Sequence, residues 1–486
     1  MNVLEKLEPL ELFRYFEDIC NIPHGSNNLL KLKEYLKDFA KKNELFCKED
    51  EAGNIFIYKD ASEGYEGEAA VLLQAHMDMF IEDSYDYDAK RDLNKEGLLL
   101  SIIDDYIYSK GSSLGALDGV GMSYILSILS DKKLKHPKIE ALFTCDRYPK
   151  MSGVLGLDTK LITSRRLISF DHYREREILN SSAGSRKVLC KVPVRYKEKT
   201  GVVYDLVICG LSGGHSGLEI DQYRGNANII LGRLLHSIDL HMKFDLFYIK
   251  GGMQYDSIPR EAKASILIKE ENINALEDIV ADFDRDLQKE YYQIEDNLTI
   301  YCENKGEDTC QCIKDRLKQR VIFLLMTIPD GIVKLCPKMQ NIVQTSLNTG
   351  IIELVKNEFV VHISIRSQLT SEKHALSDKL QYLTETIGGS YIVEENYHSW
   401  EYARYSKLRE IFSDTYFKAY GKHLIERGTH DSLECGVITD KIRDMDVVVM
   451  GVDVDNVNTT KERVSISSIQ HSYDFIVAVL EALKSN

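Results

Sequence analysis

Ala69-Ala70-Val71-Leu72-Leu73-Gln74-Ala75-His76-Met77-Asp78-Met79 is the stretch that decides the fold. Its apolar first half predicts a buried strand, and His76 and Asp78 follow at the end of that strand. An imidazole presented in this way, with a carboxylate to fix the ring, is a common metal ligand. A metal site also needs Asp, Glu or His ligands from elsewhere, and most positions where they would be expected hold other residues. The stretch therefore indicates a metallohydrolase fold that has lost much of its metal chemistry.

The composition is that of a soluble globular protein with more than one domain. At 486 residues the chain is too long for one ordinary core, so two domains are expected. Apolar residues make up 44% of the chain and charged residues 28%, as in globular proteins. The net charge of −15 is spread along the chain and argues against a nucleic-acid partner, because phosphate binding needs a basic stripe.

Targeting and cysteine patterns favour the cytoplasm. Residues 1–12 lack the apolar segment of a signal peptide, and no stretch approaches the roughly eighteen apolar residues that span a bilayer. Ten scattered cysteines without a paired framework indicate a reducing compartment. Cys302, Cys310 and Cys312 form the only cluster, and incidental free thiols explain it better than a zinc site. Cys145 and His172 lack the motif of a nucleophile pair.

Hydrophobic periodicity predicts an α/β domain interrupted by an inserted α+β domain. The α/β pattern occupies residues 1–184 and returns at 395–486, and residues 185–394 form the insertion. The expected helices are 8–20, 27–42, 120–130, 226–240, 274–290, 371–387, 406–420 and 467–484. The expected strands are 55–58, 69–75, 139–144, 245–251, 262–268, 341–347, 350–355, 358–366 and 446–450, with further strands between 187 and 211.

Nine short motifs, in order along nearly the whole chain, carry a family resemblance. They are Ile22-Pro23-His24, Gly53-Asn54-Ile55, His76-Met77-Asp78, Gly213-Gly214-His215-Ser216-Gly217, Gly225-Asn226-Ala227-Asn228, Ile258-Pro259-Arg260-Glu261-Ala262, Ser346-Leu347-Asn348, Ile365-Arg366-Ser367 and Leu433-Glu434-Cys435-Gly436. With these motifs the chain resembles the cytosolic aminoacyl-histidine dipeptidases (peptidase D, or non-specific dipeptidase), which belong with carnosinases and aminoacylases to the two-zinc exopeptidases. The resemblance implies an α/β catalytic domain with an inserted α+β lid domain, a peptide or dipeptide ligand, and a homodimer as one arrangement.

The resemblance also implies a set of zinc ligands. In the family one zinc is held by the His of His-x-Asp, a bridging Asp and a later Asp. The other is held by the bridging Asp, a Glu and a late His, and a neighbouring Glu is the general base. Residues that match are His76 and Asp171 as ligands of the first zinc and Asp78 as the residue that orients the imidazole.

The remaining positions of this set are substituted. Leu117 stands at the bridging Asp, Tyr148 at the ligand Glu and Asn458 at the late His, while Arg147 replaces the base. Two ligands are too few for a tight zinc site, which usually has three or four. An arginine cannot accept a proton at neutral pH, and losing one positioned base alone costs about 10²–10⁴-fold in rate. No catalytic residue is therefore expected to be intact, and the expected cofactor is none or one weakly bound zinc.

Acidic side chains left without metal need another partner. Because an unpaired buried charge is costly, we expect the Arg147 guanidinium to pair with Asp78, Asp171 or Asp118. Asp118, one residue after Leu117, is an alternative ligand of the first metal. However, adjacent residues of a helix do not share a face.

The substrate side matches the family better. The resemblance implies that His215 contacts the reacting carbonyl and that Arg366 and Asn348 contact the substrate carboxylate. For each of these residues a structural role in the lid is the alternative.

Three functions remain open at this point. The chain is a catalytically impaired dipeptidase homologue that still binds peptides, or an active metallodipeptidase with an altered ligand set built on His76, Asp118 and Asp171, or a non-enzymatic scaffold. Metal content separates the second from the others, and peptide binding without turnover separates the first from the third.

Overall fold

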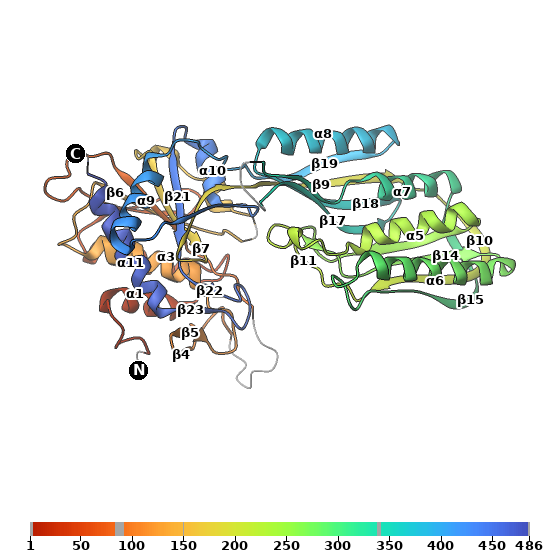
Figure 1. Cartoon of the computed structure of the whole chain (residues 1–486), viewed down its shortest axis with the longest axis horizontal. Coiled ribbons are helices and arrows are strands. Elements are labelled where there is room, and N and C mark those ends of the chain that lie inside the picture. Colours follow the sequence, from red (N-terminus) through yellow and green to blue (C-terminus); the bar gives the residue numbers. More distant parts are fainter. Residues whose placement is uncertain (1–2, 83–91, 149, 338–341, 485–486) are drawn as a thin grey trace. The chain divides into compact units, whose positions relative to one another are not determined.

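A computed structural model describes residues 3–82, 92–148, 150–337 and 342–484. The chain divides into two compact units: Met1–Ser181, Tyr402–Gly428 and Leu433–Asn486 form the first, and Ser182–Glu401 and Thr429–Ser432 form the second (Figure 1). Residues 429–432, which the sequence analysis places in the α/β domain, thus lie in the second unit. Residue 341, the start of an expected strand, lies outside the described residues.

The first unit is built on an eight-stranded sheet in the order β1-β2-β6-β3-β7-β21-β8-β20. Its middle strands run parallel, and every residue of β3 and β6 is buried, as in sheets covered on both faces. The strands are β1 (Phe46–Glu49), β2 (Ile55–Lys59), β3 (Val71–His76), β6 (Ile139–Thr144), β7 (Arg166–His172), β8 (Glu177–Ser182), β20 (Ile425–Thr429) and β21 (Asp446–Gly451). A small sheet adds β4 (Leu100–Ile103), β5 (Tyr106–Ser109), β22 (Val454–Asp455) and β23 (Arg463–Ser465).

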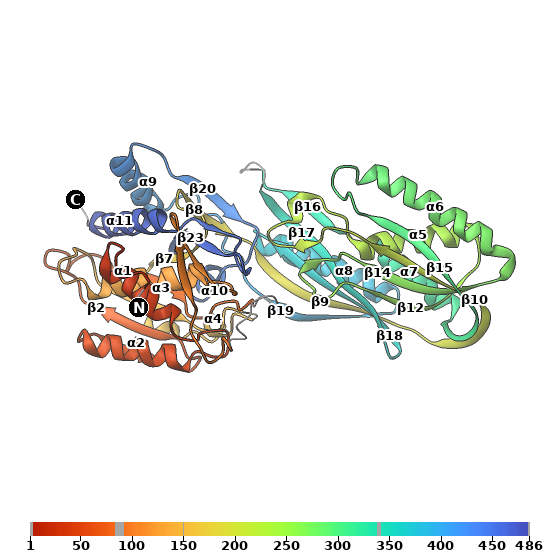
Figure 2. The same ribbon diagram turned by 90° about the horizontal axis from the view of Figure 1, so that it is seen from below.

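Five helices of the first unit share one hydrophobic core with the sheet. They are α1 (Leu10–Cys20), α2 (Leu30–Lys42), α3 (Ala116–Ser130), α9 (Lys407–Tyr420) and α11 (Ile466–Ala482) (Figure 2). Alternate strand residues such as Leu72, Leu142 and Leu167 are buried without belonging to that core. Two shorter helices, α4 (Ser152–Leu155) and α10 (Glu434–Lys441), contact each other. The result is the layered α/β arrangement expected from the sequence.

Helix α3 begins four residues before the expected start at 120, because a distant carboxylate caps it. Glu462 accepts hydrogen bonds from the backbone N–H groups of Leu114 (2.8 Å), Gly115 (3.2 Å) and Ala116 (3.2 Å). These donors have no partner within the helix, and a carboxylate also favours the positive end of the helix dipole. Gly115 has φ +64°, and a Cβ there would meet the Met79 Cβ at 2.8 Å. The earlier start brings residues 117 and 118 into the first turn.

The second unit is an α+β lid with a nine-stranded sheet. Its helices share one core, which they build against a single face of the sheet. The main strands are β9 (Gly184–Pro193), β10 (Tyr196–Cys209), β12 (Asp245–Gly251), β14 (Ala262–Ile268), β15 (Thr299–Ile313), β16 (Gly331–Leu335), β17 (Val343–Val355), β18 (Glu358–Ser367) and β19 (Ser390–Asn396), and β11 (Gly214–His215) pairs with β13 (Ser257–Ile258). The helices are α5 (Ala227–His241), α6 (Ile273–Glu290), α7 (Asp315–Thr327) and α8 (Thr370–Thr386).

Alternation along β18 decides which lid residues can bind a ligand. Ile363 and Ile365 belong to the core under the helices, so Ser364 and Arg366 lie on the opposite face of the sheet. Ser346 pairs with Arg366 across β17 and β18 and lies on the same face.

Several lid elements differ from the expected ones. The strands expected at 341–347 and 350–355 are one strand, β17, and the sequence analysis missed β15, α7, β16 and β19. Cys302, Cys310 and Cys312 lie along β15, and burial raises the pKa of each thiol, which disfavours the thiolate that zinc needs.

Glu462→Ala should lower the free energy of unfolding of the first unit by about 2–4 kcal/mol, since buried N–H donors lose their acceptor. Urea unfolding followed by circular dichroism measures the change. Glu63→Ala, an exposed carboxylate on the same unit, is the control. Equal stability of the two variants would contradict the capping role.

Candidate metal centre and lid cluster

The residues expected at a metal centre lie where parallel strands end. His76 is the last residue of β3, Thr144 is the last of β6, and Asp171 is next to last in β7. In α/β sheets, ligands bind at the carboxyl ends of the strands. The fold therefore places this group where a site is expected.

The His76 ring is held by a backbone oxygen. Its Nδ1 lies 2.9 Å from the Asp78 carbonyl oxygen, whereas the Asp78 carboxylate is 4.0 Å away. That carboxylate instead accepts hydrogen bonds from the N–H groups of Arg147 (2.8 Å) and Tyr148 (3.0 Å) and from the Ser26 hydroxyl (2.7 Å). Asp78 thus orients the imidazole through its main chain, rather than through the expected carboxylate, and its side chain fixes the segment that carries the substituted positions.

The Arg147 guanidinium pairs with Asp171, which confirms the expected ion pair. Nη2 lies 3.2 Å from Oδ2 of Asp171, and both residues are buried. The His76 Nε2 lies 4.0 Å from the other oxygen of Asp171. A cation supplied by the chain therefore sits between the strand ends and neutralises the carboxylate.

Tyr148, at another substituted position, lies beside this arginine, whose guanidinium carbon is 5.5 Å from the centre of the Tyr148 ring. Burial raises the pKa of Tyr148, and the nearby side chains of Arg147 and Asn458 lower it by a smaller amount. The Tyr148 ring lies edge-on to His76, with centroids 6.1 Å apart. The residue at the ligand-Glu position thus packs against the arginine at the base position, which pairs with Asp171.

Asp118 and Leu117 do not complete a metal site. Asp118 Oδ2 lies 3.3 Å from His24 Nε2, and the other ring nitrogen of His24 lies 2.6 Å from the Ile22 carbonyl oxygen. Burial raises the pKa of the Asp118 carboxyl. Leu117 is partly buried against the hydrophobic core. The carboxylate that could have replaced the bridging ligand therefore faces a histidine.

Two zinc ions do not fit these residues. Leu117 has no lone pair, burial raises the pKa of the Tyr148 phenol and so keeps it neutral, and a guanidinium cannot ligate a cation. Across the residues that the structure describes, no group of three or more His, Cys, Asp or Glu side chains is placed to hold a metal ion. The donor set that remains, His76 and Asp171, falls short of a zinc site.

Glu434 is a buried acid close to His76 and Arg147. No role was expected for it from the sequence. Its Oε2 accepts hydrogen bonds from Gln74 (2.7 Å) and Thr144 (2.6 Å), which lie on the two neighbouring strands. Burial raises the pKa of Glu434 to about 7, although the neighbouring His76 and Arg147 lower it by a smaller amount. The motif Leu433-Glu434-Cys435-Gly436 is the sequence feature that could have identified Glu434 as part of the site.

Glu434 should make the first unit less stable as pH rises. Its pKa is about 7 in the folded chain and about 4.3 when unfolded. The folded state therefore binds its proton more tightly, and that stabilisation is complete below the unfolded value and is lost as pH rises through 7. Unfolding of wild type and Glu434→Gln from pH 4 to 8 should diverge by on the order of 3–4 kcal/mol at the alkaline end, with Gln more stable. Parallel pH profiles would disprove this.

Arg147→Met should lower the free energy of unfolding by about 3–5 kcal/mol, because it leaves Asp171 buried without a counter-charge. Arg147→Glu should be at least as damaging, since it adds a like charge. Adding Asp171→Asn to Arg147→Met should recover most of the loss in denaturant unfolding. If the double variant is no more stable than the single one, the ion pair is not what holds this region.

The expected substrate residues lie in the lid. His215 ends β11, and Gly217 N–H donates to its Nδ1 (3.2 Å), so the neutral ring carries its proton on Nε2, 3.8 Å from Asp256. Burial, and then the Arg366 charge, lower the pKa of His215. Arg366 is buried, and its Nη2 lies 3.4 Å from His215 Nε2. These two expected residues are therefore neighbours.

Asn348 has a structural position. Its side-chain amide donates to the carbonyl oxygens of Tyr255 (3.1 Å) and Ser257 (2.9 Å), and the residue is 1% exposed. Both amide hydrogens thus hold the loop before β13 against β17. This geometry favours the structural alternative for Asn348.

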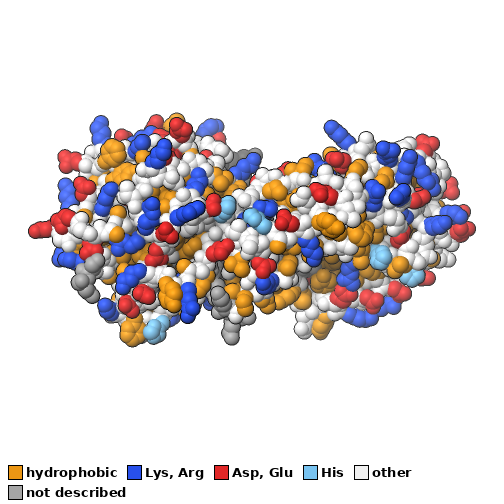
Figure 3. Space-filling model, turned by 90° about the horizontal axis from the view of Figure 1, so that it is seen from above, with side chains coloured by type: hydrophobic (Ala, Val, Ile, Leu, Met, Phe, Trp, Pro, Cys, Tyr) orange, Lys and Arg blue, Asp and Glu red, His pale blue; other side chains and the backbone are white. Residues whose placement is uncertain are grey.

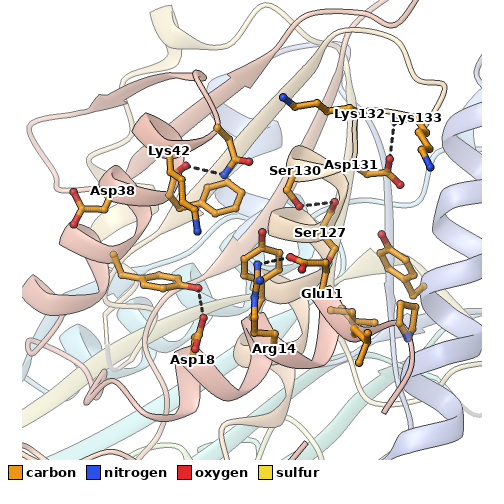
Figure 4. Close-up of a pocket in the computed structure, with 18 residues that line it drawn as sticks. Glu11, Arg14, Asp18, Asp38, Lys42, Ser127, Ser130, Asp131, Lys132 and Lys133 are labelled. Atoms are coloured by element: carbon orange, nitrogen blue, oxygen red, sulfur yellow. Dashed lines mark hydrogen bonds and ion pairs between the residues drawn. The ribbon is translucent and has the colours of Figure 1, made fainter. Parts of the chain in front are cut away.

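One described pocket lies away from these residues. It has a volume of about 950 Å³ in the first unit and is lined by parts of α1, α2 and α3. Figure 4 shows its charged side chains, of which Arg14 pairs with Glu11, and Asp18 accepts a hydrogen bond from Tyr35. On the face shown in Figure 3, basic and acidic side chains are interspersed, without the basic stripe of a nucleic-acid surface.

Comparisons with known proteins identify the family. The chain is 30% identical, over 99% of both sequences, to the cytosol non-specific dipeptidase of Escherichia coli (strain K12). The chain belongs to the cytosolic non-specific dipeptidase family. Residues 208–295 match the peptidase dimerisation domain of the M20 peptidases, which corresponds to the inserted lid. The family and fold implied by the sequence motifs are thereby confirmed.

Solved structures agree. The aminoacylhistidine dipeptidase of Vibrio alginolyticus matches with a TM-score of 0.87 and 30% identity over 99% of this chain and 98% of that one. Aminopeptidase PepT of Bacillus cereus shares the fold, with a TM-score of 0.56 and 15% identity over 98% and 99% of the two chains. Among the described helices, none is long and apolar enough to cross a membrane.

Proposed function

We propose that this chain is a catalytically impaired member of the dipeptidase family that binds a peptide or dipeptide in the cytoplasm without a functional zinc pair. The observation that carries the proposal is the ion pair between Arg147 and Asp171. Asp171, one of the two matched zinc ligands, already pairs with the Arg147 guanidinium. The base position is occupied by that same cation, so the site offers neither metal nor proton acceptor for activating a water.

The alternative of an active enzyme with an altered ligand set needs Asp118. That carboxylate would have to leave His24, which lies 3.3 Å away, and Arg147 would have to release Asp171. The second step would separate the buried Arg147 guanidinium from the Asp171 carboxylate, which disfavours the alternative. The non-enzymatic scaffold differs from our proposal only in lacking a peptide ligand, and the matched dimerisation domain supports a homodimer in either case.

Purified protein should contain well under two equivalents of zinc and show no dipeptide hydrolysis above background with added Zn²⁺, Mn²⁺ or Co²⁺. Plasma mass spectrometry gives the metal content, and the Escherichia coli relative assayed in parallel is the positive control. Metal-dependent turnover that His76→Ala abolishes would overturn the proposal.

Restoring the substituted positions together should restore metal binding. In the fourfold variant Leu117→Asp, Arg147→Glu, Tyr148→Glu and Asn458→His, zinc content should rise toward two equivalents, because each lost donor returns on the same backbone. The matched control carries the first, third and fourth changes but keeps Arg147, and should bind less zinc. Circular dichroism establishes that both variants are folded. A folded fourfold variant without zinc would show that these positions are not the ligand positions.

A further inference from the structure

In the lid, the guanidinium expected to bind a ligand carboxylate already holds one from the chain. Arg366 Nη1 lies 3.0 Å from Asp431 Oδ1, and the Arg366 side chain is 7% exposed. The Ser432 hydroxyl lies 3.4 Å from the same nitrogen. A buried arginine and a carboxylate at this distance form a strong, charge-assisted hydrogen bond.

Asp431 is held in place by its neighbours in the segment 429–432. The Thr429 carbonyl oxygen accepts from Ala183 N–H at 3.0 Å, and the Asp431 N–H donates to the Thr429 hydroxyl at 3.1 Å. His430 Nε2 lies 2.7 Å from the hydroxyl of Ser346, the residue that pairs with Arg366 across the sheet. These contacts explain why this short segment belongs to the lid unit and not to the unit on either side of it in sequence.

Asp431 is the residue of segment 429–432 that carries a charge beside Arg366. His430 is buried, and burial, with a smaller effect of Arg366, lowers its pKa to about 3, so the imidazole is neutral at physiological pH. Asp431 and Asp256 are therefore the acids beside Arg366, and His215 is uncharged for the same reason of burial. The cluster has no surplus positive charge with which to attract a carboxylate.

At least one donor of Arg366, its Nε, lacks an acceptor within the described residues. This nitrogen is buried. A buried N–H without an acceptor is costly, and an uncharged carbonyl oxygen satisfies it without the repulsion that Asp431 would exert on a second carboxylate.

We propose that Asp431 takes the place of the ligand carboxylate on Arg366, so that this lid cluster accepts a peptide through an uncharged carbonyl, as in an amidated or internal peptide, rather than through a free C-terminal carboxylate. The inference rests on the proposed peptide-binding function and specifies the class of its ligand. It concerns the lid residues alone, so it does not depend on the state of the metal centre.

The test compares alanyl-alanine with its C-terminal amide by isothermal titration calorimetry on the full chain. Wild type should bind the amide at least as tightly as the free acid. Asp431→Asn, which keeps the shape of the side chain but removes its charge, should raise the affinity for the free acid about tenfold relative to the amide. Asp431→Ser is a second variant with the same expected direction.

Controls make each outcome decisive. Adding Arg366→Gln to Asp431→Asn should remove the gain, whereas Glu271→Gln, at an exposed lid carboxylate, should leave the wild-type preference unchanged. Tighter binding of the free acid by wild type, or an unchanged preference in both Asp431 variants, would overturn the inference. Failure of the proposed function would be recognised separately, as metal-dependent turnover by the wild type.

Discussion

The candidate centre depends on the ion pair between Arg147 and Asp171. A carboxylate at the end of a buried parallel strand cannot stay ionised there without a cation, and the cost of leaving it alone exceeds most other single interactions in a protein. In relatives with the full ligand set, the resemblance implies that zinc supplies this charge. Here the guanidinium lies 3.2 Å from the carboxylate, and the Tyr148 ring packs beside the guanidinium.

The need to pair a buried charge also explains the ion pair in the lid. Arg366 is buried on the open face of the sheet, so it also needs a counter-charge, and Asp431 provides it. In both units a charge that could attract a ligand is neutralised by the chain itself. The chain thus retains the family fold with these buried charges paired.

Some of this could be predicted from the sequence. The buried strand before His76 and the order of the motifs fixed the fold class, and the rule that buried charges are paired predicted a partner for Arg147. Interactions between residues distant in sequence could not be predicted. Glu462 caps α3 from about 350 residues away, and His24 lies beside Asp118. Residues 429–432 join the lid through contacts with Ser346 and Arg366. Strand β15 was missed because it is largely exposed, so its sequence lacks the apolar alternation of a half-buried strand.

The most direct test of the account is a crystal structure of the chain grown with excess zinc, with anomalous diffraction recorded at the zinc edge. The account predicts the Arg147 guanidinium bonded to Asp171 and no anomalous peak between His76 and Asp171. A zinc ion ligated by His76 and Asp171, with Arg147 displaced from the carboxylate, would contradict it.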